Sequence, residues 1–341
     1  MATVIFPFAY LFSTSYLCSS QITNNTMLNN SVKGGIFGCI SAMSYGMNPL
    51  CALYLYQEGY HSNSVLFYRF LIGSLVLGLL MTVQRKSFSL TRCETGVLAL
   101  LGGLFAVSSA TFFLSFHYMA AGLAATLVFA YPVFVAILMA VFFHERLKWP
   151  SLLAIALTVG GISLLYEGNN GQPIRTLGVV LILISALTYA LYIIAVNRSG
   201  IVMSGVKLTF YAMFFCLIFL TLYATFTPTG SIQMLHGARA WSFSLLLGIV
   251  PTVISLVFMA MAIHCIGSTS TAIMGALEPV TAIIVGVTLF GEVLTPRLLS
   301  GILLILFSVM LIILDSRLRR ALSNVRVVKR GKLIVKRMMW K

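Results

Sequence analysis

The sequence predicts an all-α integral membrane protein with ten transmembrane helices in two inverted five-helix repeats. Three observations predict this fold: the composition, the number of long apolar runs, and the return of the same residues in the second half of the chain. The 341 residues are 60% hydrophobic and 9% charged, with a mean hydropathy of +1.01. Since a water-soluble domain carries roughly 25% charged residues, this composition excludes a soluble fold.

The apolar runs have the length that a membrane requires. A bilayer core about 30 Å thick is crossed by roughly 20 helical residues. Most of the runs contain Gly, Ser or Thr, which allow helices to pack closely in lipid. The ten predicted spans are 34–55, 62–83, 95–117, 122–143, 149–166, 177–196, 206–227, 241–264, 270–290 and 297–315.

The positions of Lys and Arg predict the orientation. If Lys33 is cytoplasmic and the chain alternates sides, 18 of the 22 Lys and Arg residues fall in cytoplasmic segments. Three fall in outside loops and Arg69 lies within a span. Because cytoplasmic loops are enriched in cations, we expect a multi-pass protein of the plasma (inner) membrane with both termini in the cytoplasm.

The same pattern divides the chain into four segments. Residues 1–32 form an N-terminal extension that we expect to be disordered or to reflect a wrongly assigned start, with translation beginning at Met27. Residues 33–166 and 177–315 are the two repeats. Residues 316–341 form a basic tail with ten Lys and Arg and no acid. This tail either lies on anionic lipid of the inner leaflet or is a solvated positive-inside segment; neither interpretation involves nucleic acid.

An internal repeat relates the two halves. The hexapeptide 40–45 (ISAMSY) returns as 184–189 (ISALTY), and Pro132-Val133 returns as Pro279-Val280 at an offset of 147 residues. Each repeat holds five spans, and since five is odd, the second repeat enters the membrane from the opposite side. Inverted repeats are typical of secondary transporters with a central substrate site.

These residues resemble the EamA family of the drug/metabolite transporter superfamily. The resemblance covers about residues 33–315 and implies a ten-helix permease that moves small metabolites, often outward. One departure is Ala212, which stands where the pattern of the second span would place a basic residue, so Arg69 has no counterpart in the second repeat. The matching stretches are Tyr68-Arg69-Phe70, Tyr131-Pro132-Val133, Glu145-Arg146-Leu147 and Gly160-Gly161 in the first repeat, and Leu277-Glu278-Pro279-Val280, Phe290-Gly291-Glu292-Val293-Leu294 and Gly301 in the second.

Two charged residues within spans are candidates for a substrate site. Glu278 lies inside the ninth span directly before Pro279, and a carboxylate at membrane depth costs several kcal/mol unless it is paired, hydrated or protonated. It is expected either to line a cavity, binding an ammonium group or cycling a proton, or to be a helix-packing carboxyl. Arg69 either neutralises a substrate carboxylate, pairs with Glu278 or a helix end, or extends toward the interface.

A polar and aromatic set accompanies these charges. Tyr45 and Asn48 of the first span, with Tyr189 and Tyr192 of the sixth, are candidates for the cavity wall, or they are ordinary packing residues. Pro49, Pro132 and Pro279 predict helix kinks, because proline removes a backbone donor and clashes with the preceding turn.

Other titratable residues point to architecture. Glu145 and Glu292 end the fourth and ninth spans, where a carboxylate suits the N-terminus of the following helix, so we interpret them as structural. His117 and His264 lie near the ends of the third and eighth spans, where imidazoles shuttle protons or have no role.

Catalysis, cofactors and metals are not expected. The six cysteines form no CxxC pair, which excludes a thiolate zinc site, and the sequence contains no nucleophile elbow, HExxH helix, P-loop or dinucleotide fingerprint. We therefore expect a carrier for a small neutral, zwitterionic or amphipathic solute such as an amino acid, of undefined oligomeric state. A channel or scaffold, and less so a membrane-embedded enzyme, are the alternatives.

Overall fold

The computed structural model describes residues 24–144, 149–166, 175–201, 203–226, 231–293, 295–311 and 313–314. These residues form helices and no β-strand. The basic tail, Glu145 and the first 23 residues lie outside this part of the chain. The helices are α2 (Asn24–Gly46), α3 (Asn48–Gln57), α4 (Ser62–Val83), α5 (Arg92–Ser115), α6 (Ala121–Val128), α7 (Tyr131–Phe143), α8 (Trp149–Tyr166), α9 (Thr176–Arg198), α10 (Gly205–Phe226), α11 (Gly237–Gly248), η3 (Ile249–Ile254), α12 (Ser255–Met274), α13 (Leu277–Phe290) and a final helix Pro296–Leu311.

Seven of the described helices are long and apolar enough to cross a membrane. Three shorter apolar helices accompany them, namely Trp149–Leu165, Leu277–Phe290 and Pro296–Leu311. The all-helical membrane class predicted from the sequence is therefore confirmed. The seven long helices are Val32–Gln57, Ser62–Val83, Arg92–Ser115, Ala121–Phe143, Thr176–Arg198, Gly205–Phe226 and Gly237–Ile263.

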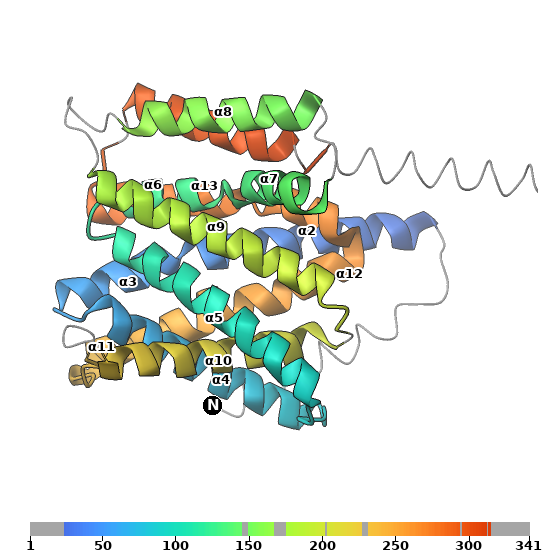
Figure 1. Cartoon of the computed structure of the whole chain (residues 1–341), viewed down its shortest axis with the longest axis vertical. Coiled ribbons are helices and arrows are strands. Elements are labelled where there is room, and N and C mark those ends of the chain that lie inside the picture. Colours follow the sequence, from blue (N-terminus) through green and yellow to red (C-terminus); the bar gives the residue numbers. More distant parts are fainter. Residues whose placement is uncertain are drawn as a thin grey trace, which may run out of the picture.

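The helices lie side by side as a bundle (Figure 1). Helices α2, α5, α9 and α12 occupy its middle, while α8 and the final helix form a pair at one edge. That edge pair is joined by a hydrogen bond between the hydroxyls of Thr158 and Ser308 at 2.6 Å. The backbones approach closely there, because a Cβ on Gly161 would lie 2.9 Å from the carbonyl oxygen of Gly301.

Two serine pairs join the central helices. Ser41 of α2 donates to the carbonyl of Ser255 in α12 at 2.8 Å. The hydroxyls of Ser108 in α5 and Ser185 in α9 each donate to the other residue's carbonyl, at 3.0 and 2.8 Å. Ser185 follows Ser41 by 144 residues and Ser255 follows Ser108 by 147, the two offsets of the sequence repeat. The contact between α2 and α12 and the contact between α9 and α5 are therefore made by equivalent residues of the two halves.

The proline residues lie at helix breaks. Pro49 follows the turn at Met47 that separates α2 from α3, and Pro132 and Pro279 lie in the first turns of α7 and α13. The break before Pro49 has a local partner, since Asn48 Nδ2 donates to the carbonyl of Tyr45 at 2.8 Å. That carbonyl is the one whose helical donor Pro49 removes.

The gap predicted between the spans 241–264 and 270–290 is present, because the backbone of α12 is non-helical at Gly267 and the long apolar helix ends at Ile263. Gly267 has a φ of 79°, a conformation that glycine adopts at little steric cost. One feature differs from the sequence expectation. The π-helical turn η3 was not expected; it contains Pro251, whose missing N–H disturbs the α-helical hydrogen bonds.

Adjacent glycines in α8 provide a test of the edge pair. A Cβ on Gly161 would also lie 2.7 Å from Ile305 Cγ1, whereas nothing lies within 4 Å of a Cβ on Gly160. Gly161→Ala is expected to destabilise the purified protein by about 1–3 kcal/mol, the usual effect of overpacking. Gly160→Ala in the same helix is expected to be neutral or slightly stabilising. Equal thermal unfolding midpoints for the two variants would contradict this packing.

Candidate functional site

A cavity of about 470 Å³ lies between the central helices. Its wall combines aromatic rings, serine hydroxyls and two charged side chains, a composition typical of small-molecule sites. The lining residues are Gly38, Ser41, Ala42, Tyr45, Arg69, Phe105, Ser108, Ser109, Phe112, Val128, Phe129, Tyr131, Ser185, Tyr189, Ile193, Ser255, Leu256, Met259, Ile263, Thr271, Gly275 and Glu278.

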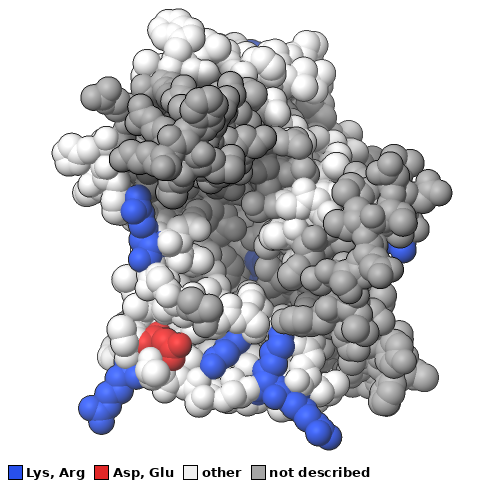
Figure 2. All heavy atoms as spheres, turned by 90° about the vertical axis from the view of Figure 1, so that its right-hand side faces the viewer, with Lys and Arg blue, Asp and Glu red and all other residues white. Residues whose placement is uncertain are grey.

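Several of the described cations lie at one end of the bundle. Figure 2 looks onto the end where α2 and α5 begin, and shows several Lys and Arg side chains around a face that is hollowed near its middle. Gly38 and Ile193 of the cavity wall are close in the chain to Lys33 and Arg198 of this end. The cavity therefore extends from the middle of the bundle toward the cationic end.

Arg69 is held within the cavity wall by α4 and is 2% exposed. Its Nε donates to Thr252 Oγ1 at 3.1 Å. The guanidinium carbon lies 5.3 Å from the ring centre of Phe113, 5.4 Å from that of Phe70 and 5.9 Å from that of Tyr45. Within the described residues no carboxylate lies within 4 Å of it. Its neighbours are aromatic faces and the hydroxyls of Thr252 and Tyr45, and Glu278 interacts with it electrostatically over a longer distance.

Glu278 lies in the first turn of α13, where the kink before Pro279 brings it to the cavity wall. The chain is tightly packed behind it, because a Cβ on Gly46 would lie 2.5 Å from the carbonyl oxygen of Glu278. Among the described residues its carboxylate has no hydrogen-bond or ion-pair partner. A carboxylate at this depth is costly unless something in the cavity compensates it.

The aromatic wall is continuous. Tyr131 meets Tyr189 edge to face at 4.8 Å, and Tyr189 stacks on Tyr192 at 5.8 Å. Phe105 contacts Tyr192 at 5.5 Å. Tyr192 therefore supports the lining ring of Tyr189 from behind and does not itself line the cavity.

Of the six sequence candidates, four line one cavity: Tyr45, Arg69, Tyr189 and Glu278. Asn48 does not line it. Asn48 is buried, and its amide nitrogen donates a hydrogen bond to the Tyr45 carbonyl. Its Oδ1 has no hydrogen-bond partner among the described residues. Sequence reasoning did not identify the lining serines or Tyr131 as cavity residues.

The repeat offset could have found these missed residues. Tyr131 precedes Glu278 by 147 residues, so the two stand at equivalent positions of the two halves. The neutral wall is duplicated, whereas both charges are unique, since Ala212 matches Arg69 and Tyr131 matches Glu278. The duplicated lining pairs are Ser41 with Ser185, Tyr45 with Tyr189, and Ser108 with Ser255.

The opposite end of the bundle is closed by contacts between the halves. Glu292 accepts hydrogen bonds from the backbone N–H groups of Ala121 at 2.8 Å and Gly122 at 3.3 Å. Glycines leave room for this carboxylate, because a Cβ on Gly122 would lie 3.0 Å from Glu292 Oε2 and one on Gly286 would overlap it. We call this contact the Glu292 clamp.

The clamp corrects the expectation that Glu292 caps the helix that follows it. Thr295 caps that helix instead, accepting from the N–H of Leu298 at 3.3 Å. The left-handed turn at Gly291 folds the chain back, so Glu292 supplies the cap that α6 lacks. Burial raises the pKa of Glu292, partly offset by the two N–H donors.

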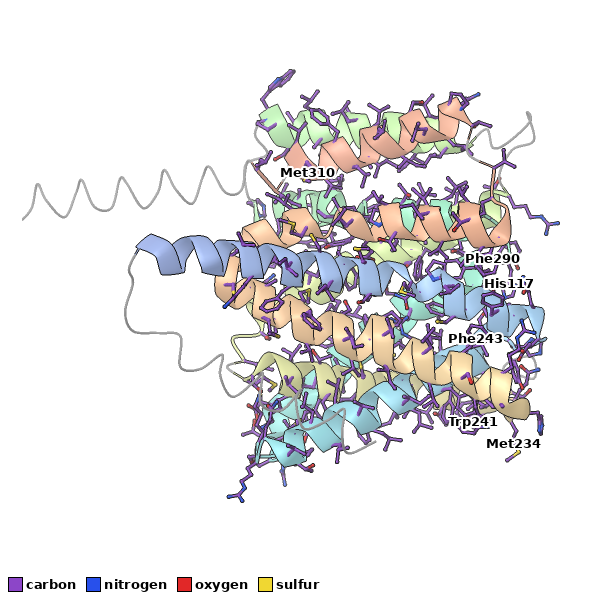
Figure 3. All side chains as sticks on the ribbon, turned by 180° about the vertical axis from the view of Figure 1, so that it is seen from behind. His117, Met234, Trp241, Phe243, Phe290 and Met310 are labelled. Carbon is purple, nitrogen blue, oxygen red and sulfur yellow. The ribbon has the colours of Figure 1, made fainter. Side chains whose placement is uncertain are left out.

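Aromatic residues surround the same closed end, where Figure 3 shows His117, Phe243 and Phe290. Tyr54 contacts Phe243 at 4.6 Å and Phe290 at 5.2 Å. His117 stacks on Tyr56 at 4.5 Å and shares a hydrogen bond with the Ser62 hydroxyl at 3.0 Å. Burial, and then the nearby His61, lower the pKa of His117. The side chain of His264 lies outside the described part of the chain.

The described residues contain no group of three or more His, Cys, Asp or Glu side chains that could hold a metal.

The comparison with protein families identifies the family of this chain in both of its halves. The model of the EamA-like transporter family matches residues 32–167 and again residues 176–314. The chain belongs to the EamA-like transporter family. This membership points to transport and not to catalysis.

Relatives of this EamA-like protein are named as transporters. The uncharacterized transporter YcbK of Bacillus subtilis (strain 168) is 23% identical over 278 residues, which is 78% of this chain and 88% of YcbK. A protein named "Probable terminal-alkyne amino-acid exporter" from Streptantibioticus cattleyicolor is 28% identical over 197 residues, or 56% of this chain and 64% of that protein. One crystal structure of 18% identity matches with a TM-score of 0.58 over 83% of this chain and 97% of the other, which shows a shared fold.

The Glu292 clamp of this EamA-like protein can be tested without a substrate. Glu292→Ala removes the acceptor of two backbone N–H groups, and hydrogen bonds to a charged group contribute about 1.5–3 kcal/mol. Hydrogen exchange measured by mass spectrometry is expected to accelerate about 10- to 100-fold in peptides that cover Ala121 and Gly122.

The matched control is Glu58→Ala at the same end of the bundle. Glu58 pairs with Arg239 at 3.3 Å in a contact that solvent reaches, and such pairs contribute little. Exchange at Ala121 and Gly122 is expected to remain unchanged in this variant. Unchanged exchange in Glu292→Ala as well would contradict the clamp.

Proposed function

We propose that this EamA-like protein is a secondary transporter that moves a small zwitterionic metabolite, such as an amino acid or a related amphipathic solute, across the plasma membrane by alternating access. The observation that carries the proposal is the cavity with an unpaired cation, Arg69, and an unpaired anion, Glu278, on its wall. A zwitterion supplies the opposite charge to each of them.

The proposed architecture has ten spans in two inverted halves. The seven long helices and the three shorter apolar helices together match the ten predicted runs in order. The family model matches twice, once in each half. The two serine pairs are related by the repeat offset, which supports halves that pack on each other through equivalent helices.

The proposed orientation has both termini in the cytoplasm. It rests on the larger number of Lys and Arg residues in the segments assigned to the cytoplasm, where such residues are enriched. Figure 2 shows several Lys and Arg side chains at the corresponding end of the bundle. The cavity extends toward that end, so this conformation is inward-open, with the Glu292 clamp closing the outer side. Alternating access then requires the clamp to open and the serine-paired helices to rock against each other.

The chemistry of the wall supports the substrate class. The guanidinium of Arg69 suits a carboxylate, and the carboxylate of Glu278 suits an ammonium group. Phe105, Phe112 and Tyr189 offer apolar surface to a side chain. The relative named as an amino-acid exporter fits the same class. A phosphate or nucleotide-sugar carrier would need several cations within the spans, and the sequence has only Arg69 there.

The experiment uses three related solutes in proteoliposomes: L-leucine, 3-methylbutylamine, which lacks the carboxylate, and 4-methylpentanoate, which lacks the ammonium group. Counterflow of labelled L-leucine is expected to saturate and to be inhibited best by L-leucine itself. In Arg69→Gln we expect L-leucine and 3-methylbutylamine to inhibit counterflow with similar affinity. In Glu278→Gln we expect L-leucine and 4-methylpentanoate to inhibit counterflow with similar affinity. Each change is expected to be about 10- to 100-fold, from hydrogen bonds of about 1.5–3 kcal/mol to charged groups.

Glu58→Gln is the control for loss of a charge outside the cavity, and it is expected to leave all three affinities unchanged. Flux that does not saturate would favour a channel over a carrier. Saturable transport in which the amine or the acid competes as well as leucine would contradict the zwitterion site.

A further inference from the structure

The π-helical turn η3 has no part in the function proposed above, yet it touches the cavity cation. It interrupts the long apolar helix between α11 and α12 and packs beside α4. Such turns are rare and occur often at functional sites. What this one does follows from two neighbouring residues, Pro251 and Thr252.

Pro251 leaves a carbonyl without its donor. In an α-helix the N–H of residue 251 would bond the carbonyl of Leu247, and proline has no N–H. Thr252 Oγ1 donates to that carbonyl at 3.1 Å. A Thr or Ser hydroxyl is a common replacement for such a lost donor within membrane helices. The single proton of the Thr252 hydroxyl is thereby committed to Leu247.

The commitment makes Thr252 an acceptor for Arg69. A hydroxyl has one proton and two lone pairs, so with its proton on Leu247 it can only accept from other groups. Arg69 Nε donates to this oxygen at 3.1 Å. Both residues are almost fully buried, with Thr252 1% and Arg69 2% exposed, so water does not compete for the contact.

Glycines hold the two helices at this spacing. A Cβ on Gly73 of α4 would lie 3.0 Å from Thr252 Cγ2, and a Cβ on Gly248 would lie 2.6 Å from Ile72 Cγ2. The methyl group of Thr252 is therefore packed against α4 while its oxygen faces Arg69. The packing of the methyl group against α4 and the hydrogen bond to Leu247 together fix the position of the hydroxyl.

The contact selects which edge of the guanidinium faces the cavity. Arginine presents five N–H donors in a planar fork. Thr252 engages Nε from outside the cavity lining, and the hydroxyl of Tyr45 interacts with the guanidinium from the cavity wall. A pair of Nη groups binds a carboxylate through two parallel hydrogen bonds. The opposite half has no such device, because Phe105 and Ala212 stand at the positions equivalent to Thr252 and Arg69.

We infer that Thr252 is a positioning residue for substrate recognition: it holds Arg69 by Nε so that the N–H groups of the two Nη atoms donate hydrogen bonds to the substrate's carboxylate. This inference rests on the proposed zwitterion site. It goes further in assigning carboxylate specificity to a residue that does not line the cavity.

The test compares inhibition of labelled L-leucine counterflow by L-leucine and by 3-methylbutylamine. Thr252→Val keeps the shape and removes the acceptor, and is expected to reduce the preference for leucine over the amine about tenfold. Thr252→Ser restores the hydroxyl and is expected to keep the wild-type preference. Gly73→Ala displaces Thr252 without removing its hydroxyl and is expected to give an intermediate loss.

Thr126→Val is the matched control. Thr126 is fully buried and its hydroxyl bonds the carbonyl of Gly122 within α6, away from the cavity lining. This variant is expected to keep the preference for leucine. A merely structural role of Thr252 would weaken leucine and the amine together in Thr252→Val, and that result would overturn the inference.

The outcomes separate this inference from the proposed function. An unchanged preference in Thr252→Val, combined with a loss in Arg69→Gln, would reject the role of Thr252 and leave the zwitterion site standing. An unchanged preference in Arg69→Gln would reject the proposed site itself, and the positioning role would fall with it.

Discussion

Two opposite charges face the same cavity in the middle of this membrane protein. Arg69 and Glu278 line it in surroundings of aromatic rings and serine hydroxyls. They interact electrostatically with each other but form no ion pair within 4 Å in the part of the chain that the structure describes. A charge without close pairing is costly at membrane depth, and we propose that a bound solute offsets this cost.

Two helix irregularities bring these charges to the cavity wall. The kink before Pro279 turns Glu278 to the wall, and the π-helical turn that contains Pro251 presents Thr252 to Arg69. The neutral wall is contributed about equally by both halves, as expected of a duplicated fold. The two charges have no equivalents in the other half, and we propose that this asymmetry orients the substrate. At the far end the Glu292 clamp joins the halves through backbone donors and needs no cation.

Much of the fold was readable from the sequence because apolar length and the repeat offset are strong signals. The same signals placed Tyr45, Arg69, Tyr189 and Glu278 as cavity candidates. The sequence did not show that Asn48 lies outside the cavity lining. Its hydrogen bond to the Tyr45 carbonyl, which lacks a helical donor because of Pro49, depends on side-chain geometry. The sequence analysis placed Glu292 at the N-terminus of the following helix, whereas its carboxylate caps α6 by accepting from Gly122, 170 residues earlier in the chain. Such a contact depends on tertiary folding. The π-helical turn could not be predicted from hydropathy, because one extra residue in a helical turn does not change the apolar character of the run.

We propose that the two charges bind the two ends of one solute. A high-resolution structure of the protein with bound L-leucine would show whether they do. We expect the leucine carboxylate to lie about 3 Å from the Nη atoms of Arg69, with its ammonium group at the Glu278 carboxylate and Thr252 still on Nε. A structure in which leucine binds elsewhere, or in which Arg69 and Glu278 pair directly with each other while leucine is bound, would contradict the account.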